Sequence, residues 1–430
     1  MTGVVVKDSI LQRREVREWL AQVGEAEILV GIPSYNNAAT IGHVVRAIQA
    51  GLAKYFPDCK AVLVNADGGS LDGTGDVVRQ AAVADLAALF TQHRTVPLQR
   101  LATPYYGLPG KGSAFRAIFE LAEALGVKAC AVVDSDLRSI TPEWAELLLK
   151  PVLGGEFDYV APLYRRHKYD GTITNSIIYP LTRALYGRRV RQPIGGDFGF
   201  SGKLASFFLN KDVWESDVAR FGIDIWMTTS AIANGYRVCQ AYLGAKIHDP
   251  KDPGADLSAM LCQVVGATFD LMEEYSGVWT GVVASQPVPT FGFDYAVGLE
   301  PVAVNVERMV DRFALGVRDL GDVWSTVLPP TLVTKLSRLA QADAKHFHLP
   351  DELWVETVVH FALAAHRSVM NREHLLKSLT PLYIGRTASF VLQTRESSSD
   401  EVEDLIEGLC RLYEQEKAEL CANWMQKSAN

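Results

Sequence analysis

Residues 28–66 read ILVGIPSYNNAATIGHVVRAIQAGLAKYFPDCKAVLVNA, and this stretch decides the fold. Two short apolar runs, ILVGIP and AVLVNA, flank a longer segment in which apolar residues recur at helical spacing. The order strand, helix, strand favours two parallel strands, because such a pair needs a crossover of about a dozen residues or more. The alternation continues through KACAVVD (128–134) to about His248. The sequence therefore predicts an α/β protein with a mostly parallel, Rossmann-like sheet and ligands bound beyond the carboxyl ends of its strands.

The sequence changes character after Pro253. Apolar residues then recur at helical spacing in the stretches 257–275, 304–320, 353–370 and 402–420. We therefore expect an α/β domain over residues 1–254 and a helical C-terminal region over residues 255–430, with the Pro- and aromatic-rich stretch 281–301 as a connection. The apolar stripes of these helices favour packing on the first domain or a homodimer.

Composition restricts the class of protein and its partners. The 430 residues are 48% hydrophobic and carry a formal net charge of −8, which argues against general binding to nucleic acid or to anionic membranes. The N-terminus lacks the pattern of a signal peptide, and no apolar run approaches the length of a membrane span. The six cysteines form no CxxC pair, and Cys130 and Cys239 lie in apolar runs typical of buried strands. We expect a cytoplasmic protein with reduced thiols and a small-molecule partner.

Two polar loops follow the first two predicted strands. Pro33, Ser34, Tyr35 and Asn37 lie where the first strand ends, and their backbone amides and short side chains suit the base and ribose of a nucleotide. An ordinary strand-to-helix turn capped by asparagine explains them equally well. Asp67 follows the second strand in the glycine-rich segment NADGGSLDGT (65–74) and is placed to accept a hydrogen bond from a base, although such a turn also occurs without a ligand.

Two further segments carry charge at predicted strand ends or helix starts. Lys111 lies between two glycines where a helix begins, which suits a phosphate but also a plain helix cap. The segment lacks the spacing of a P-loop, so ATP hydrolysis is not indicated. Asp134, Ser135 and Asp136 follow the strand KACAVV, where two carboxylates would be costly to bury unless a divalent cation neutralised them. Mg²⁺ or Mn²⁺ with a diphosphate is the natural partner.

Taken together and in this order, IPSYNNAATI (32–41), NADGGSLDGT (65–74), GKG (110–112) and VVDSDL (132–137) resemble the nucleotide-binding half of the GT-A glycosyltransferases. Four later segments narrow the resemblance to the retaining family that includes glucosyl-3-phosphoglycerate, mannosyl-3-phosphoglycerate and glucosylglycerate synthases. These segments are 170–187, 192–202, 220–238 and 242–252. The resemblance covers about residues 27–260. It implies transfer of glucose or mannose from a UDP- or GDP-sugar to glycerate or 3-phosphoglycerate.

The resemblance also implies roles for individual residues. The nucleotide-sugar pocket would be formed by Pro33, Ser34, Tyr35, Asn37, Asp67, Lys111, Asp134 and Ser135. Asp136 and His248 would bind the metal ion, and Asp224 and Lys111 would act in catalysis. The acceptor's acidic group would bind on Gly171, Thr172, Ile173 and Thr174 at a helix start.

Residue chemistry alone leaves several of these roles open. His248 can be a solvated turn histidine, and Asp224 can be a helix-cap carboxylate. The basic run 164–168 can be an ordinary solvated loop, or it can attract an anionic acceptor. The family commonly has arginine at the place of Thr172, and without it glycerate becomes at least as good a candidate acceptor as 3-phosphoglycerate. Two other functions stay open. One is an inverting transferase that acts on a saccharide or lipid acceptor with Asp224 as base. The other is a non-catalytic protein that binds sugar nucleotides.

Overall fold

The chain forms two compact units, each built from separate stretches of sequence. A computed structural model describes residues 9–81, 98–105, 108–247, 257–294 and 302–426. Unit 1 comprises Met1–Arg165, Gln192–Asp249 and Val288–Leu299, and unit 2 comprises Arg166–Arg191, Pro250–Pro287 and Glu300–Asn430. Unit 2 therefore includes a stretch, 166–191, that lies well before residue 254 in the sequence. The expected boundary between residues 254 and 255 falls outside the described residues.

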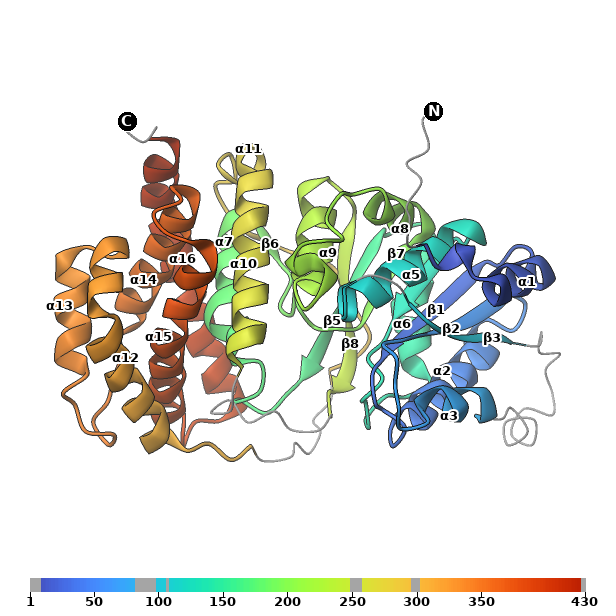
Figure 1. Cartoon of the computed structure of the whole chain (residues 1–430), viewed down its shortest axis with the longest axis horizontal. Helices are drawn as coiled ribbons and strands as arrows, with labels where there is room; N and C mark the ends of the chain where they lie inside the picture. Colours follow the sequence, from blue (N-terminus) through green and yellow to red (C-terminus); the bar gives the residue numbers. More distant parts are fainter. Residues whose placement is uncertain (1–8, 82–97, 106–107, 248–256, 295–301, 427–430) are drawn as a thin grey trace. The chain divides into compact units, whose positions relative to one another are not determined.

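Unit 1 is built on one eight-stranded sheet with the order β10-β8-β5-β7-β4-β1-β2-β3 (Figure 1). Its strands are β1 (Ile28–Ser34), β2 (Ala61–Asp67), β3 (Gln99–Pro104), β4 (Ala129–Val132), β5 (Tyr159–Arg165), β7 (Phe198–Ser201), β8 (Val238–Ala245) and β10 (Thr290–Phe291). Neighbouring strands are parallel except for β7, which runs antiparallel to β4 and β5. The predicted α/β class and mostly parallel sheet are confirmed.

Helices cover both faces of this sheet. They are η1 (Ile10–Gln12), α1 (Arg14–Val23), α2 (Ile41–Tyr55), α3 (Thr74–Gln80), α5 (Lys111–Ala124), α6 (Glu143–Leu153), α8 (Gly202–Leu209), η3 (Asp217–Ala219) and α9 (Ile223–Ala233). The apolar sides of α2 and α6 pack on one face of the sheet, around Val30, Leu63 and Trp144. Gly31 faces the other way, and there a Cβ would meet Ile118 of α5 at 2.5 Å. This alternation explains why β1 is apolar at nearly every position.

Unit 2 is helical, as predicted for the C-terminal region. Its elements are η2 (Thr174–Ile178), α7 (Tyr179–Tyr186), α10 (Ser258–Glu274), α11 (Ser276–Trp279), α12 (Val306–Val327), α13 (Pro330–Leu339), α14 (Asp351–His366), α15 (Arg372–Gln393) and α16 (Ser399–Met425), with the short strands β6 (Arg188–Arg189) and β9 (Gln286–Pro287). Buried Arg183 fixes α7 to α16 through Glu407 and Glu414. Among the described helices, none has the length and apolar character needed to cross a bilayer.

Three details of the fold differ from the expectations or extend them. The stretch 281–301 was expected to be a connection, but its described part contributes β9 to unit 2 and β10 to the edge of the sheet in unit 1. Apolar residues also recur at helical spacing over residues 75–90; this pattern begins as α3, and its continuation after Ala81 lies outside the described residues. Cys130 and Cys239 are buried in β4 and β8, as their apolar surroundings indicated.

Candidate active site

The carboxyl ends of β1 and β2 meet because the parallel register pairs Ser34 with Asp67. The Asp67 carboxylate accepts hydrogen bonds from Ser34 Oγ (3.0 Å), Ser70 Oγ (2.6 Å), Ser70 N (2.8 Å) and Gly69 N (3.1 Å). Four bonds match the usual capacity of an ionised carboxylate. Asp67 therefore holds the glycine-rich loop together, a role that adds to the nucleotide contact expected from the sequence.

Asn37 joins the loop after β1 to the segment after β4. Its Oδ1 accepts from Tyr35 N at 2.9 Å and from Ser135 Oγ at 2.8 Å. Thr40 Oγ1 donates to the carbonyl of Ser135 at 2.9 Å. Because both contacts at Oδ1 come from donors, the amide group of Asn37 presents its two N–H donors elsewhere. The structure thus brings together three sequence-predicted residues, Tyr35, Asn37 and Ser135, and Tyr35 is 64% exposed.

A cluster of two lysines and three aspartates lies at the ends of β4, β7 and β8 and at the starts of α5 and α9. Lys111 Nζ lies 2.8 Å from Asp134 Oδ1 and 3.2 Å from Asp224 Oδ2. Lys246 Nζ lies 2.6 Å from Asp134 Oδ2 and 2.7 Å from Asp197 Oδ2. Asp134 therefore bridges both ammonium groups. With all five ionised, the cluster carries one net negative charge.

The cluster is buried, and this sets the protonation of its members. Burial raises the pKa of Asp134, but the two ammonium groups outweigh burial and hold that pKa well below its ordinary range. Burial also raises the pKa of Asp224 and of Asp197, the charge of Asp134 adds to the rise, and the neighbouring lysines only partly offset it. Burial lowers the pKa of Lys111, but Asp134 and Asp224 more than compensate and raise it. Lys111 therefore stays charged at neutral pH, while Asp224 and Asp197 are the carboxyl groups of the cluster whose protonation burial favours.

Two members of this cluster, Asp197 and Lys246, were not singled out from the sequence. Asp197 accepts from the backbone N–H of Asp134 at 2.7 Å and from the hydroxyl of Tyr164. Lys246 also donates to the carbonyl of Gly195 at 2.8 Å. Gly196 has φ +93°, and a Cβ there would overlap Asp134 and lie 3.0 Å from Lys246 Nζ. The signal in the sequence was the pair of glycines before an aspartate, which marks a close approach of backbone to side chains.

The glycines on either side of Lys111 serve packing. A Cβ at Gly112 would overlap the carbonyl oxygen of Val218, and the N–H of Gly112 donates to Arg220 O at 3.2 Å. The segment 218–220 therefore covers the start of α5, where the sequence suggested a phosphate. Lys111 contributes to the site through its side chain, in the cluster described above.

Asp136 differs from Asp134 in having no hydrogen bond or ion pair within the described part of the chain, although it is half-buried. The neighbouring backbone reaches the end of β8, because Arg138 N donates to Ile247 O and Ile247 N donates to Ser139 Oγ, both at 2.9 Å. His248, the expected second metal ligand, lies outside the described residues. Those residues contain no group of three or more His, Cys, Asp or Glu side chains arranged to hold a metal ion.

The expected acceptor segment belongs to unit 2. Its helix starts after Gly171, which has φ +73°, and Thr172, Ile173 and Thr174 are buried. Thr172 Oγ1 lies 2.5 Å from the hydroxyl of Tyr383 in α15. Part of the neighbouring basic run has a structural role, since Lys168 Nζ donates to three carbonyls, those of residues 394, 395 and 397. Arg165 pairs with Asp294, so these two cations are already engaged.

Comparisons with known proteins gave matches among solved structures only. No protein-family model and no curated protein matches the chain. Three solved structures of glucosyl-3-phosphoglycerate synthase from Mycobacterium tuberculosis are similar to it, with the ligands Mn²⁺, UDP and phosphoglyceric acid; Mg²⁺ and UDP; and Mn²⁺, UDP-glucose and glycerol 3-phosphate. Their identities are 22%, 22% and 23%, each with a TM-score of 0.43. They cover 61%, 62% and 61% of this chain and 85%, 86% and 87% of their own. The enzyme named in the comparison is one that the sequence motifs resemble.

Proposed function

We propose that the chain is a metal-dependent retaining glycosyltransferase that moves glucose or mannose from a UDP- or GDP-sugar to glycerate or 3-phosphoglycerate. The observation that carries the proposal is the buried Lys111, Asp134, Asp224, Lys246 and Asp197 cluster at the carboxyl ends of the strands. In a parallel α/β sheet this edge is where ligands bind. Buried ionisable groups with shifted pKa values gather preferentially at catalytic sites.

The nucleotide would bind on the loops after β1 and β2. Pro33, Ser34 and Tyr35 line the end of β1, and the exposed Tyr35 ring offers an apolar face to a base. The two N–H donors of Asn37 suit ribose hydroxyls. Asp67 keeps the loop in shape, and a base N–H would have to share its carboxylate with the loop donors.

The metal ion would be held by Asp136 and His248. Asp136 is a half-buried carboxylate with no hydrogen bond or ion pair to the described residues, close in sequence to backbone that bonds to Ile247, and it fits the oxygen ligands that Mg²⁺ and Mn²⁺ accept. When bound, the ion would neutralise the diphosphate of the donor. Asp134 is ion-paired with both lysines, so its role in the site is to hold their ammonium groups beside the position of the diphosphate.

Lys111 and Asp224 would act at the transferred sugar. Lys111 supplies positive charge toward the departing diphosphate, and charge stabilisation of this kind is commonly the largest catalytic contribution. Asp224 Oδ1 is buried and has no hydrogen-bond partner in the described part of the chain, so it can accept from a sugar or acceptor hydroxyl. We infer attack by the acceptor hydroxyl on the face that the diphosphate leaves, without a carboxylate nucleophile.

One assay tests this proposal against its alternatives. UDP- and GDP-sugars are screened with glycerate and 3-phosphoglycerate in the presence of Mg²⁺, and the anomeric configuration of the product is determined by NMR. We expect an α-linked glycoside formed with retention. A product of inverted configuration would support the inverting transferase with Asp224 as base. Tight nucleotide binding without transfer to any acceptor would support the non-catalytic protein. A homodimer and a cytoplasmic location stay predictions from the sequence.

A further inference from the structure

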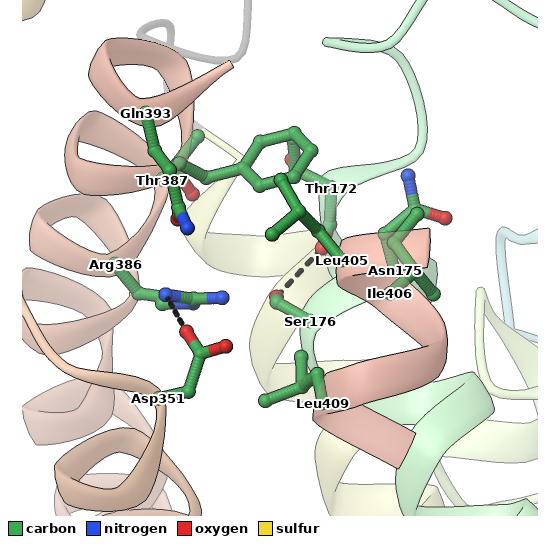
Figure 2. Close-up of a pocket in the computed structure, with 11 residues that line it drawn as sticks. Thr172, Asn175, Ser176, Asp351, Arg386, Thr387, Gln393, Leu405, Ile406 and Leu409 are labelled. Atoms are coloured by element: carbon green, nitrogen blue, oxygen red, sulfur yellow. Dashed lines mark hydrogen bonds and ion pairs between the residues drawn. The ribbon is translucent and has the colours of Figure 1, made fainter. Parts of the chain in front are cut away.

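Unit 2 contains a small cavity enclosed by η2, the start of α14, α15 and α16 (Figure 2). Its volume of about 20 Å³ is enough for about one water molecule. Thr172, Thr387 and Arg386 give it polar walls, and Phe390 and Leu409 give it apolar ones. Every lining residue belongs to the same compact unit. The mixed lining is that of a ligand pocket, in which a few placed polar groups stand among apolar ones.

Arg386 is the charged group of this cavity. Its side chain extends from α15 into the pocket and is 3% exposed (Figure 2). One end of the guanidinium is engaged, because Nη1 lies 2.6 Å from Asp351 Oδ1 and donates to Leu349 O. The buried Nε has no hydrogen-bond partner in the described part of the chain. An unpaired donor of this kind is costly to bury, so the structure carries a group that a ligand acceptor would satisfy.

The backbone beside the cavity is also unusual. Thr174–Ile178 form a π-helical turn, a conformation that is rare and recurs at functional sites. Two side chains from unit 2 hold it, since Trp354 Nε1 and Tyr413 Oη both donate to the carbonyl of Ser176, at 2.8 and 3.2 Å. The turn is therefore fixed from the side of α14 and α16, and it presents Thr172 and Asn175 to the cavity.

We propose that this cavity is a binding site for a small carboxylate, which the free edge of the Arg386 guanidinium holds. Arginine binds carboxylates through paired N–H donors, and the side bearing Nε is the one left open by Asp351. Asp351 already cancels the positive charge of Arg386, so a monoanion is favoured over a phosphate dianion. Thr172, just before η2, and Thr387, on α15, line the cavity from two elements, and their hydroxyl groups, which also bond to Tyr383, suit a hydroxycarboxylate such as glycerate.

We place the entry beside Gln393, the exposed residue of the lining. The carboxylate takes the place that one water fills, and the rest of the ligand lies at the opening beside Gln393 and Asn175. Gln393 is exposed and Asn175 is half-buried, so both can turn outward without disturbing packed residues. The ligand is either the sugar acceptor of the proposed function or a separate small acid, and both share this chemistry. Binding of the acid in this cavity does not require the protein to transfer a sugar.

The test measures binding of acetate and D-glycerate to the full-length chain by ligand-observed NMR at fixed ionic strength. We expect Arg386→Lys to weaken both ligands about tenfold or more, because lysine keeps the charge but loses the paired donors. The matched control is Arg372→Lys on the same helix, which should bind as wild type. Gln393→Trp, at an exposed position, should close the mouth without loss of fold, with Gln341→Trp as its control.

The two sources of the carboxylate are separated by enzyme kinetics. If the acceptor occupies the cavity, Arg386→Lys raises the KM for glycerate by the factor by which it weakens glycerate binding. If a separate acid occupies the cavity, Arg386→Lys leaves the KM for glycerate unchanged, while its binding of acetate is still weakened. The proposal is overturned if neither ligand binds wild type, or if both pocket variants bind like their controls, since the cavity then holds only water. Displacement of glycerate by inorganic phosphate at equal concentration would also overturn it. Absence of sugar transfer alone would count against the proposed function and leave this result untouched.

Discussion

Two aspartates only two positions apart in the chain have opposite surroundings. Asp134 is fixed between Lys111 and Lys246, while Asp136 has no partner in the described residues. Ser135 between them donates to Asn37 and so fixes the segment to the loop after β1. Removing each aspartate should therefore have a different consequence. The buried lysines need Asp134 for their charge, whereas Asp136 is free to meet a ligand.

We expect Asp136→Ala to lower sugar transfer at least about a hundredfold, because the diphosphate would lose its counter-charge. Its free energy of unfolding should stay within about 0.5 kcal/mol of wild type, since no hydrogen bond or ion pair to the described residues is lost. Asp134→Ala should instead destabilise the fold by about 3–5 kcal/mol, because it leaves two buried ammonium groups short of a partner. Urea unfolding and transfer assays with Mg²⁺ measure both effects. Full activity of Asp136→Ala in EDTA would exclude the proposed metal site, and equal stability of the two variants would contradict the difference in surroundings.

A single buried lysine should make the stability of the protein depend on pH in the alkaline range. Lys417 donates to Leu185 O at 3.1 Å and to Val282 O at 2.6 Å, and burial lowers its pKa from 10.5 to about 8. Below about pH 8 the lysine is charged in both states, and the folded state carries the full cost of burying that charge. Between pH 8 and 10.5 the unfolded chain binds more protons, so stability rises with pH, by at most about 1.4 kcal/mol per pH unit.

The measurement is the free energy of unfolding in urea at intervals from pH 7 to pH 10.5. Lys417→Gln keeps a donor for the carbonyls but does not titrate, so the difference between wild type and this variant isolates the lysine. We expect that difference to change in favour of wild type as the pH rises. A constant difference across the range would show that the charge of Lys417 is well solvated in the folded state.

At the residue scale, the sequence indicated the side chains that follow strands. Ser34, Asn37, Asp67 and Ser135 come together because the ends of parallel strands share one edge. Lys246 could not be found in this way. It directly follows β8, and only the fold shows that β8 brings it to Asp134. Asp197 lies just before β7 and was marked only by the two glycines that precede it, because nothing in the local sequence indicates the antiparallel direction of β7.

At the scale of elements, the start of α5 shows how a short motif can be misread. The sequence GKG suggested amides open to a phosphate. In the structure, residues 218–220 lie so close that side chains at Gly110 and Gly112 would overlap their backbone. The glycines therefore allow two segments far apart in the sequence to meet. That contact positions Lys111, at the start of α5, against Asp224, which follows in the first turn of α9.

We expect Gly112→Ala to destabilise the protein by about 1–3 kcal/mol, because the added methyl group overlaps the carbonyl oxygen of Val218. Gly408→Ala is the matched control, since a Cβ at that position in α16 meets nothing within 4 Å. In an open helical position alanine should stabilise by about 0.5–1 kcal/mol. Thermal and urea unfolding give both values. Stabilisation of the same size in the two variants would mean that 218–220 do not press on α5.

The periodicity of the sequence indicated most elements of unit 1 and the helices of unit 2, because each buries a regular apolar face. It did not indicate β10, a two-residue strand, since so short a run has no periodicity. Nor did it indicate that residues 166–191 leave the sheet and join the helical unit. Local patterns cannot show this, because the α16 partners of Arg183 in α7 come more than two hundred residues later.

At the scale of the whole molecule, the chain order and the structural units do not coincide. Unit 2 needs residues 166–191 as well as the C-terminal helices. The clearest link within it is Arg183, which is 1% exposed and donates to Glu407 Oε1 at 2.9 Å and to Glu414 Oε1 at 2.8 Å. Both glutamates lie on α16. A buried guanidinium without these carboxylates would cost about 3–5 kcal/mol.

A fragment of residues 1–254 should therefore be poorly folded around residues 166–191, even though it contains seven of the eight strands of the sheet. Without α16, Arg183 and apolar residues such as Leu181 and Leu185 lose their cover. We expect rapid proteolysis within 166–191 in the fragment and resistance there in the full chain. A second fragment, in which a Gly-Ser linker replaces residues 167–190, removes the uncovered segment and should melt cooperatively. If the first fragment resisted proteolysis as well as the full chain, α7 would not depend on α16, and a division of the protein near residue 254 would describe its folding better than the two units do.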